Sequence, residues 1–308
     1  MMGKLALHIR PYQKQDATEV AALHNLLYPE AWHTPLSLNN WVSTVRECGG
    51  ELWVSGWGNS VVAYAAVAPV PGLPGVVHLS GGVLASYRSR GIGQQMLDHV
   101  LALAHQNKIQ QISCTLHSLN DATARFLFRR GFVLEHEEWV MKRPYLTQLP
   151  PSIPPNPDCH IHSCARHEAI PLFCTLYDAS FRPHPWYQPY TEEEVAATLE
   201  SNRDLLFLYH QQTPIGFAWV HEQDARQGSI EPLGVVPGHQ GKGYGRYLLL
   251  TALHHLRQKG VTQAIIGAWK QNQAAIHLYQ QLGFQLTQSI YYLIYNLTNK
   301  SDQKENQI

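Results

Sequence analysis

Residues 234–245 read Gly-Val-Val-Pro-Gly-His-Gln-Gly-Lys-Gly-Tyr-Gly, and they combine a strand end, a glycine-rich turn and the start of a helix. The glycines carry no Cβ, so successive backbone N–H groups can converge on an anion at the helix N-terminus. A phosphate or pyrophosphate is the ligand that such a turn favours. Two familiar phosphate loops are excluded. Gly243 follows Lys242 where a Walker A loop has Ser or Thr, and Arg246 stands where the dinucleotide fingerprint has glycine.

The pattern around this turn occurs twice, at one constant spacing. The landmarks that recur 152 positions apart are Gly91 and Gly243, Asn120 and Asn272, and Gly131-Phe132 and Gly283-Phe284. An ungapped register over so long a stretch predicts two copies of one domain, and 308 residues are enough for two. The proline-rich segment 149–158 is typical of a semi-rigid linker. We therefore expect an N-terminal domain over 1–148, a linker over 149–158, a C-terminal domain over 159–298 and a polar tail over 299–308.

Apolar spacing predicts the same order of elements in each half. The strands that precede the glycine turns end at Val83 and Val235, and a long amphipathic helix follows each turn. The remaining strands are expected at 5–10, 52–56, 61–67, 109–116 and 139–141, and at 160–164, 205–209, 215–220, 261–268 and 290–295. A helix after the first strand and another before the last strand complete each copy. The pattern indicates an α/β class with a mixed sheet.

Composition narrows the classes of function. The formal net charge is zero and charged residues make up 15% of the chain, against about 25% in typical proteins, which argues against a nucleic-acid partner. The longest apolar run, 61–70, is too short to span a membrane, and the N-terminus lacks the apolar core of a signal peptide. Five cysteines at irregular spacing do not suggest a disulfide framework. We expect a cytoplasmic protein with neither a nucleic-acid nor a membrane partner; the oligomeric state is not encoded in these patterns.

Two motifs together resemble one known family. The Gln-x-x-Gly-x-Gly pattern after a Val-x-Pro strand end is similar to the acyl-CoA pyrophosphate loop of the GNAT N-acyltransferases. Residues 272–284 resemble the Asn-x-x-Ala-x-x-Leu-Tyr-x-x-x-Gly-Phe segment of that family. The first half carries an eroded copy of both motifs, so the layout is similar to that of the mycothiol synthases, in which two such domains share one chain. The resemblance implies two tandem GNAT domains and an acetyl-CoA-dependent transfer of an acetyl group directly to a primary amine of a small molecule.

The resemblance also implies which residues hold acetyl-CoA. Backbone groups at the strand end would contact the pantetheine arm and the thioester, and the turn would surround the pyrophosphate with N–H groups. These residues are Leu233, Gly234 and Val235 on the strand, and Gln240, Gly241, Lys242, Gly243, Tyr244, Gly245 and Arg246 in the turn and helix start. Asn272 would bond the pantetheine arm, and it also suits the N-cap of the following helix.

Direct transfer needs a base for the amine and an acid for the departing thiolate. Tyr279 matches the proton donor of the family and lies two helical turns after Asn272. Glu231, on the strand that leads to the turn, is the candidate base, acting directly or through water. The alternative interpretation of Glu231 is a carboxylate with a structural role only.

The first half departs from the family pattern at both catalytic positions. At the spacing of 152, Tyr279 corresponds to Leu127 and Glu231 to Leu79, and neither side chain can move a proton. A possible second acyl-CoA site remains, formed by Val83, Arg88, Ser89, Arg90, Gly91, Ile92, Gly93 and Asn120. The first half therefore either binds acyl-CoA or serves only as a scaffold, and we expect catalysis by the second half alone. The alternative for the whole chain is a non-catalytic module that binds acyl-CoA or another protein.

Two further clusters have no assigned role. The group Cys159, His160, His162, Cys164, His167 and Cys174 fits no standard zinc spacing, and we expect no metal. The aromatic stretch 181–190 either closes over an apolar acceptor or packs between the two domains.

Overall fold

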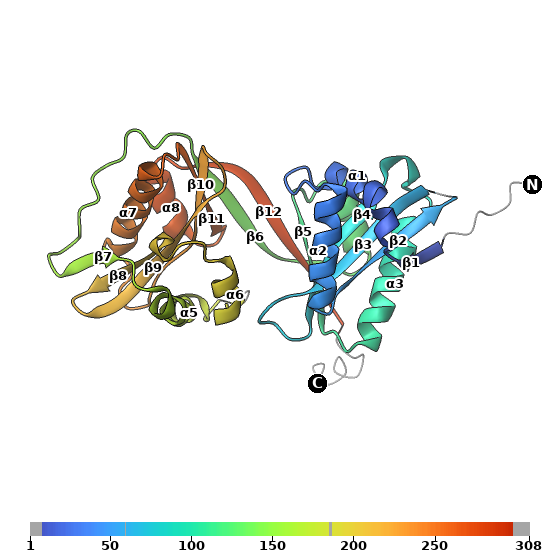
Figure 1. Cartoon of the computed structure of the whole chain (residues 1–308), viewed down its shortest axis with the longest axis horizontal. Coiled ribbons are helices and arrows are strands. Elements are labelled where there is room, and N and C mark those ends of the chain that lie inside the picture. The colour runs from blue at the N-terminus through green and yellow to red at the C-terminus, as the bar shows by residue number, and fades with distance from the viewer. Residues whose placement is uncertain (1–7, 59, 185–186, 298–308) are drawn as a thin grey trace, which may run out of the picture. The chain divides into compact units, whose positions relative to one another are not determined.

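The computed structural model describes residues 8–58, 60–184 and 187–297, and within them the chain divides into two units (Figure 1). Unit 1 consists of the described residues up to Thr115, of Arg125–Val133 and of the described residues from Leu293. Unit 2 consists of Leu116–Ala124 and Leu134–Tyr292. The predicted polar tail 299–308, the first three residues of the strand predicted at 5–10, and Trp186 of the aromatic stretch lie outside the described residues.

Unit 1 carries a sheet in the order β1-β2-β3-β4-β5, antiparallel except for the parallel pair β4–β5. The elements of the first half of the sequence are β1 (His8–Pro11), η1 (Lys14–Asp16), α1 (Ala17–Leu27), α2 (Pro35–Glu47), β2 (Glu51–Trp57), β3 (Ser60–Pro69), β4 (Val76–Val83), η2 (Ala85–Tyr87), α3 (Ile92–Gln106), β5 (Gln111–Leu116), α4 (Ala122–Arg129) and β6 (Val133–Arg143).

Unit 2 carries a sheet in the order β6-β11-β10-β9-β8-β7, in which only β10 and β11 are parallel. The elements of the second half are β7 (Cys159–His162), α5 (Arg166–Phe181), α6 (Glu192–Thr198), η3 (Asn202–Asp204), β8 (Leu205–His210), β9 (Thr213–Glu222), β10 (Gln227–Val235), α7 (Tyr244–Gln258), β11 (Gln263–Trp269), α8 (Gln273–Gln281) and β12 (Gln285–Asn296). The predicted mixed α/β class is confirmed.

The sheet of unit 2 is covered on both faces, which explains why β8 is apolar without alternation. Leu206 and Leu208 belong to the core that α7 and α8 form with one face. Leu205 and Phe207 belong to a second core, which contains residues of α5 and α6. Figure 1 shows these two helices on the opposite side of the sheet from α7 and α8. Successive side chains of a strand alternate between faces, so a strand between two helical layers must be apolar at every position. Each such buried Leu or Phe contributes about 1.5–3 kcal/mol.

The last strand of each half does not complete its own copy, so that part of the prediction is wrong. β6 pairs antiparallel with β11, from Arg143 opposite Ala264 to Glu138 opposite Trp269, and therefore belongs to unit 2. β12 runs beside β6 in unit 2, and its residues from Leu293 lie beside β5 in unit 1. The spacing of 152 could not reveal this exchange, because β6 and β12 occupy equivalent positions in the two copies.

The segment predicted as a linker is held against unit 2. Ser152 Oγ lies 2.7 Å from Thr251 Oγ1, and His254 Nε2 lies 2.8 Å from the carbonyl oxygen of Pro150. Both partners are on α7, so this proline-rich segment runs along that helix. Whether the domains divide at 149–158 stays a prediction.

Two short helices, α2 and α6, were not expected from apolar spacing. Each begins with a capping box, in which a threonine accepts from a backbone N–H three residues later and the third residue bonds back to the threonine N–H. Thr34 and Ser37 form the box of α2, and Thr191 and Glu194 that of α6. The Thr-x-x-Ser and Thr-x-x-Glu patterns were therefore the signals that could have located both helices.

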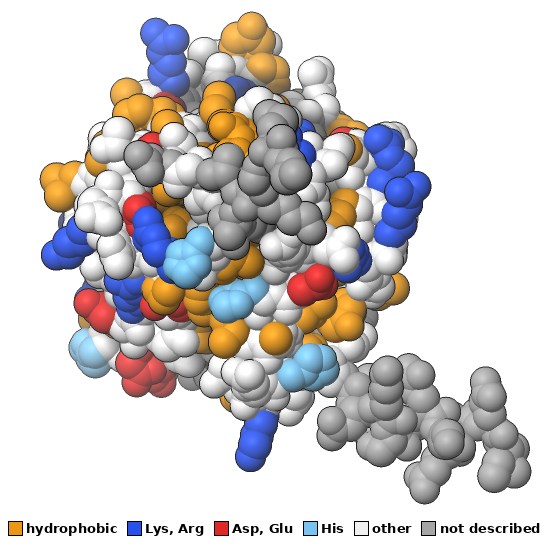
Figure 2. Space-filling view, turned by 90° about the vertical axis from the view of Figure 1, so that its right-hand side faces the viewer, with side chains coloured by type: hydrophobic (Ala, Val, Ile, Leu, Met, Phe, Trp, Pro, Cys, Tyr) orange, Lys and Arg blue, Asp and Glu red, His pale blue; other side chains and the backbone are white. Residues whose placement is uncertain are grey.

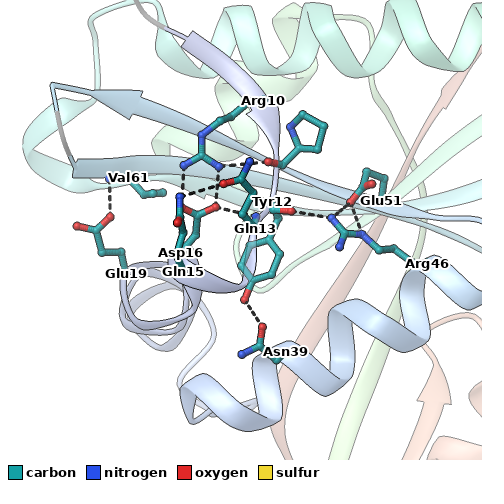
Figure 3. A network of polar contacts seen from close by, with 11 residues as sticks. Arg10, Tyr12, Gln13, Gln15, Asp16, Glu19, Asn39, Arg46, Glu51 and Val61 are labelled. Carbon is teal, nitrogen blue, oxygen red and sulfur yellow. Dashed lines mark hydrogen bonds and ion pairs between the residues drawn. The ribbon is translucent and has the colours of Figure 1, made fainter.

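A polar network ties the first helices of unit 1 to its sheet (Figure 3). Arg10 on β1 donates two hydrogen bonds of 2.7 Å to Asp16, the residue that precedes α1. Arg46 on α2 donates to Glu51 on β2 and to the carbonyl oxygen of Tyr12. Such bidentate pairs fix the orientation of the elements that carry them.

The surface gives no sign of a large charged area on the face drawn in Figure 2, where side chains of both signs are scattered in small groups. Among the helices in the described ranges, none is both long enough and apolar enough to cross a membrane.

Candidate functional site

The strand pair β10–β11 opens in the middle of the sheet of unit 2. Among the described residues, the paired register of these two strands covers Gln227–Ser229 and Gln263–Ile265 only, although β10 continues to Val235. A bulge between Ile230 and Leu233 shifts the pairing of β10 with β9 at the same point. A bulge re-aims the strand and its backbone groups. The predicted residues Leu233, Gly234 and Val235 form the end of β10 beyond this opening.

The glycine turn follows directly and has the conformation that its glycines predict. Gly238, Gly241 and Gly243 have φ values of +83°, +75° and +86°, in the left-handed region. Gly243 is the N-cap of α7 and offers no side chain to the first N–H groups of the helix, which are therefore left for a ligand. A Cβ at Gly238 or Gly241 would meet nothing within 4 Å, so the turn is open on that side.

Polar side chains brace the turn. Gln240 Nε2 donates to the carbonyl oxygen of Val235 at 2.8 Å, and Lys242 Nζ donates to that of Gly238 at 2.8 Å. Tyr244, Gly245 and Arg246 form the first turn of α7, where Tyr244 is buried and Arg246 is exposed.

The turn of the first half has the same construction. Arg88 Nε donates to the carbonyl oxygen of Val83 at 3.1 Å, at the positions equivalent to Gln240 and Val235. Ser89 and Gly91 have φ values of +61° and +80°, and Gly91 is the N-cap of α3. The remaining predicted residues of this possible second site are Arg90 in the turn, Ile92 and Gly93 at the start of α3, and Asn120 before α4.

The strand before that turn differs from β10. The register of β3 with β4 runs without a bulge from Ala63 opposite Val83 to Pro69 opposite Val77. The Tyr28 hydroxyl accepts from the N–H of Gly81 at 3.0 Å and donates to the Gly81 carbonyl oxygen at 3.2 Å. Gly81 is equivalent to Leu233, so in unit 1 a side chain of the same unit occupies the backbone groups at this position.

Asn272 and Tyr279 lie on α8 as predicted. Asn272 is its N-cap, because the Asn272 side chain accepts from the N–H of Ala275 at 3.1 Å, so the helix-cap interpretation is confirmed. Tyr279 is 5% exposed, and burial raises the pKa of its hydroxyl, with a further rise from the charges of Glu231 and Glu138.

Glu231 and Glu138 form a pair of carboxyls in unit 2, on the two strands that flank β11. Solvent reaches the Glu231 side chain. Protein atoms nevertheless surround it closely, and this burial, together with the charge of Glu138, raises the pKa of Glu231 to about 7. Burial also raises the pKa of Glu138, which is half-buried. The Tyr292 hydroxyl donates to Glu138 Oε2 at 3.1 Å.

Sequence reasoning missed Glu138, and the reason is the strand exchange. Glu138 lies on β6, in the first half of the sequence, and its equivalent in the second half is Ile290. The repeat therefore gave no sign of it. The one available clue was an acidic residue directly before the strand predicted at 139–141.

Aromatic rings surround the carboxyl pair. Burial raises the pKa of Tyr177 and Tyr190, and the charge of Glu231 adds to both shifts. The Tyr190 ring packs on Phe173 and Tyr177, with centroid distances of 5.3 and 4.8 Å, and Phe181 packs on Trp269 at 5.8 Å. The described part of the aromatic stretch therefore packs on its own unit.

The cysteine and histidine cluster has no geometry suited to a metal. His160, His162 and Tyr209 form a stack of rings on β7 and β8, with His162 and Tyr209 at 4.4 Å. Within the part of the chain that the structure describes, no three or more His, Cys, Asp or Glu side chains gather as metal ligands would.

The comparisons with known proteins agree with the repeat. The sequence profile described as the acetyltransferase (GNAT) family matches residues 17–132 and again residues 171–284. The chain is 31% identical over 209 residues to a mycothiol acetyltransferase of Thermobispora bispora, covering 64% of this chain and 69% of that protein. It is 30% identical over 244 residues to a mycothiol acetyltransferase of Mycolicibacterium smegmatis, covering 73% of this chain and 77% of that protein.

Solved structures share the fold over nearly the whole length. A GCN5-related N-acetyltransferase from Sphaerobacter thermophilus superposes with a TM-score of 0.73 at 17% identity, covering 95% of this chain and 96% of that one. A tandem GNAT protein from the clavulanic acid biosynthesis pathway superposes with a TM-score of 0.68 at 16% identity, covering 96% and 100%. At these identities the likeness concerns the fold alone.

Proposed function

The chain belongs to the acetyltransferase (GNAT) family, and on that premise we propose that unit 2 transfers the acetyl group of acetyl-CoA directly to a primary amine of a small molecule. One observation carries the proposal. Glu231 and Tyr279 share one electrostatic environment at the opening of β10 and β11, whereas the equivalent positions of unit 1 hold Leu79 and Leu127. At these two positions, only unit 2 has side chains that can take and give a proton.

The glycine turn of unit 2 suits the pyrophosphate of acetyl-CoA. Gly238 and Gly241 leave the approach open, and the uncapped N–H groups of α7 carry the partial positive charge of a helix N-terminus. The backbone of Leu233 to Val235 would hold the pantetheine arm and orient the thioester. Asn272 would donate from its amide nitrogen, because its oxygen caps α8.

Acetyl-CoA supplies an acyl carbon bonded to sulfur, and the residues of unit 2 supply the proton transfers. Glu231 would take a proton from the acceptor ammonium, and a pKa of about 7 suits a base near neutral pH. Tyr279 would give its hydroxyl proton to the departing sulfur. Burial raises the pKa of Tyr279, so the proton stays on the oxygen until a stronger base than water forms beside it.

The acceptor would be a small amine. Relatives that match more than two thirds of their own length are named mycothiol acetyltransferases, so an amine related to mycothiol is the first acceptor to test. Other primary amines complete the panel, with release of the CoA thiol as the readout.

The test compares Tyr279→Phe with the wild-type chain, and Gly243→Val with Gly91→Val. Tyr279→Phe is expected to lower kcat by about 100-fold or more, the range of a lost general acid, with acetyl-CoA affinity nearly unchanged. Gly243→Val is expected to abolish acetyl-CoA binding. Gly91→Val is its matched control, because both glycines are left-handed N-caps at equivalent positions and should suffer similar strain.

Calorimetry should find one tight acetyl-CoA site, lost in Gly243→Val and kept in Gly91→Val. Two equal sites would contradict the assignment of binding to unit 2. A wild-type chain that binds acetyl-CoA but releases no thiol with any amine would overturn the enzyme proposal in favour of a binding module.

A further inference from the structure

We propose that Glu138 is a positioning residue for Glu231, and that the two carboxyls together form the subsite for the acceptor's ammonium group. The proposal rests on the function proposed above and adds the class of acceptor, a protonated primary amine without a nearby carboxylate. It also makes a residue of the first half of the sequence part of the site of unit 2.

The two side chains converge over one glycine. A Cβ built on Gly267 of β11 would lie 2.8 Å from Glu231 Oε1 and closer still to Glu138 Oε1. The two glutamates come from β10 and β6, the strands on either side of β11. Their carboxyl groups therefore meet over the middle strand, where only a glycine leaves room for them.

The two carboxyls also lie close enough to act on each other, since the charge of Glu138 raises the pKa of Glu231. A carboxylate has no proton to donate, so a hydrogen bond between the two would require one shared proton. Two carboxyls this close cannot both ionise readily, because each negative charge raises the proton affinity of the other. Glu138 thus makes Glu231 a base that holds a proton near neutral pH.

Several titratable groups face the carboxyl pair. The titratable groups are Tyr279 on α8, Tyr177 on α5, Tyr190 after it, Tyr292 and His136 on the strands at Glu138, and His221, whose Nε2 lies 3.1 Å from the carbonyl oxygen of Glu231. No Lys or Arg forms a salt bridge with either carboxyl among the ion pairs of the described residues.

The neighbouring Glu137 shows what a structural glutamate of the same strand looks like. It pairs with Lys270 at 2.8 Å and accepts from Trp139 Nε1 and Ser289 Oγ. Glu138 instead accepts a hydrogen bond from the Tyr292 hydroxyl. The Tyr292 ring is stacked on that of His136, with 4.2 Å between the ring centroids. A carboxyl pair that solvent reaches and that has no Lys or Arg partner among the described residues suits a cation brought by the substrate.

The chemistry balances as follows. The acceptor enters as R–NH3⁺ between the two carboxyls, and one N–H proton passes to Glu231. The freed lone pair forms the new bond from nitrogen to the acetyl carbon as the bond from that carbon to sulfur breaks. The sulfur takes the Tyr279 proton. Of the two protons that nitrogen loses, one restores the Tyr279 hydroxyl and the other leaves through the carboxyl pair to solvent. An acceptor with its own carboxylate beside the amine would be repelled by Glu138.

The experiment compares Glu138→Gln with Glu137→Gln in the full chain, using one primary amine without a carboxylate. In Glu138→Gln the rise of kcat with pH is expected to move to lower pH by about one unit or more, the usual size of a close like-charge effect. The KM for the amine is expected to rise about tenfold while the KM for acetyl-CoA stays unchanged. Glu137→Gln should alter neither the pH profile nor the ratio of the two KM values.

A second readout does not depend on turnover. Carboxyl ¹³C NMR of the wild-type chain should show a glutamate that titrates near pH 7, and this titration should move to lower pH in Glu138→Gln. Tyr292→Phe should move it in the same direction by less, because Glu138 then keeps the shared proton more readily. Tyr292→Phe therefore still tests the proposal if Glu138→Gln does not fold.

Three results would overturn the proposal. One is an unchanged titration and pH profile in both Glu138→Gln and Tyr292→Phe. Another is a KM for acetyl-CoA that rises as much as that for the amine, and the third is equal use of amines with and without an adjacent carboxylate. Failure of the proposed function is distinguishable, because a wild-type chain without transferase activity still gives the NMR titration.

Discussion

At the scale of single residues, Glu231 is in an environment that opposes its charge. Its side chain is open to solvent on one side, while protein atoms and Glu138 surround it on the others and raise its pKa to about 7. A folded-state pKa above the unfolded value of about 4.3 means that the folded protein binds the proton more tightly. The stability that Glu231 contributes is therefore present at low pH and lost as the pH rises from about 4.5 to 7.

Glu231→Gln should for this reason raise the thermal stability at pH 8 and change it little at pH 4. The neutral amide removes the cost of ionising the pair, and each kcal/mol regained raises Tm by about 2–4 °C for units of this size. Differential scanning calorimetry of both proteins at the two pH values measures the effect. A variant that is less stable than wild type at pH 8 would show that Glu231 is held by favourable contacts.

Glu137→Gln is the control, because the pKa of Glu137 is shifted in the opposite direction from that of Glu231. Burial acts to raise the pKa of Glu137, but the bonds from Lys270, Trp139 and Ser289 outweigh it, so the pKa of Glu137 is lowered. Its contribution to stability is present above the unfolded pKa and lost as the pH falls. The variant should be less stable than wild type at pH 8 and closer to it at pH 3.

The sequence predicted Glu231 and Tyr279 as a pair, and the structure brings the two into one electrostatic environment. Glu138 could not be predicted with them, because a motif reports residues near one another along the chain. The contact of Glu138 with Glu231 depends on which strand lies beside β11, and that choice leaves no mark on the spacing of the repeat.

At the scale of elements, sequence patterns predicted where strands and helices end better than they predicted which strands pair. The strand ends at Val83 and Val235 are confirmed, and Gly260 follows α7 with φ +90°, as a helix stop should. Each of these depends on residues close in sequence, whose conformational preferences suffice to predict them. The irregularity of β10 lies at Pro232, whose missing N–H indicates a broken ladder, and the bulge confirms that interpretation. The regular ladder of β4 was not predicted, because it depends on which backbone groups find partners across the sheet.

Tyr28 provides a test of that difference between the units. Its hydroxyl bonds both backbone groups of Gly81, so Tyr28→Phe should leave two groups unsatisfied and destabilise unit 1 by about 1–3 kcal/mol. Transferase activity of unit 2 should stay unchanged below the temperature at which unit 1 unfolds. Thermal unfolding and thiol release, measured on one preparation, check both parts.

The outcome for Tyr28→Phe that would contradict this account is a loss of kcat without a loss of stability. Such a result would mean that the Tyr28 hydroxyl serves the reaction. The corresponding residue of unit 2 is Ser180, whose hydroxyl is buried and has no hydrogen-bond partner among the described residues, so a role like that of Tyr28 is not repeated there.

At the scale of the whole molecule, the exchanged strands mean that the second half of the sequence cannot build unit 2 alone. Met141 of β6 is fully buried in the core with α7, and Leu146 beyond it is 1% exposed. Losing one such side chain costs about 2–5 kcal/mol, a large part of the 5–15 kcal/mol that stabilises a typical domain. Removing β6 would also leave the edge of β11 unpaired.

A chain of residues 149–308 should therefore fail to unfold cooperatively, whereas a chain of residues 133–308 should recover a cooperative transition. The two differ by β6 and the segment with Leu146, and the longer chain serves as the control. Thermal unfolding followed by circular dichroism is the measurement. A cooperative transition in the shorter chain at the temperature of full-length unit 2 would contradict the assignment of β6 to its core.

The same exchange has a consequence for how the protein is made. β5 leaves the ribosome well before Leu293, the first residue of β12 that lies beside it in unit 1. At synthesis rates of about 5–20 residues per second, the open edge of β5 waits on the order of ten seconds for its partner. An unpaired strand edge invites pairing with other chains during that time. The N-terminal half of the nascent chain should therefore be bound by a chaperone until translation ends, and a premature stop codon anywhere before β12 should leave both units incomplete.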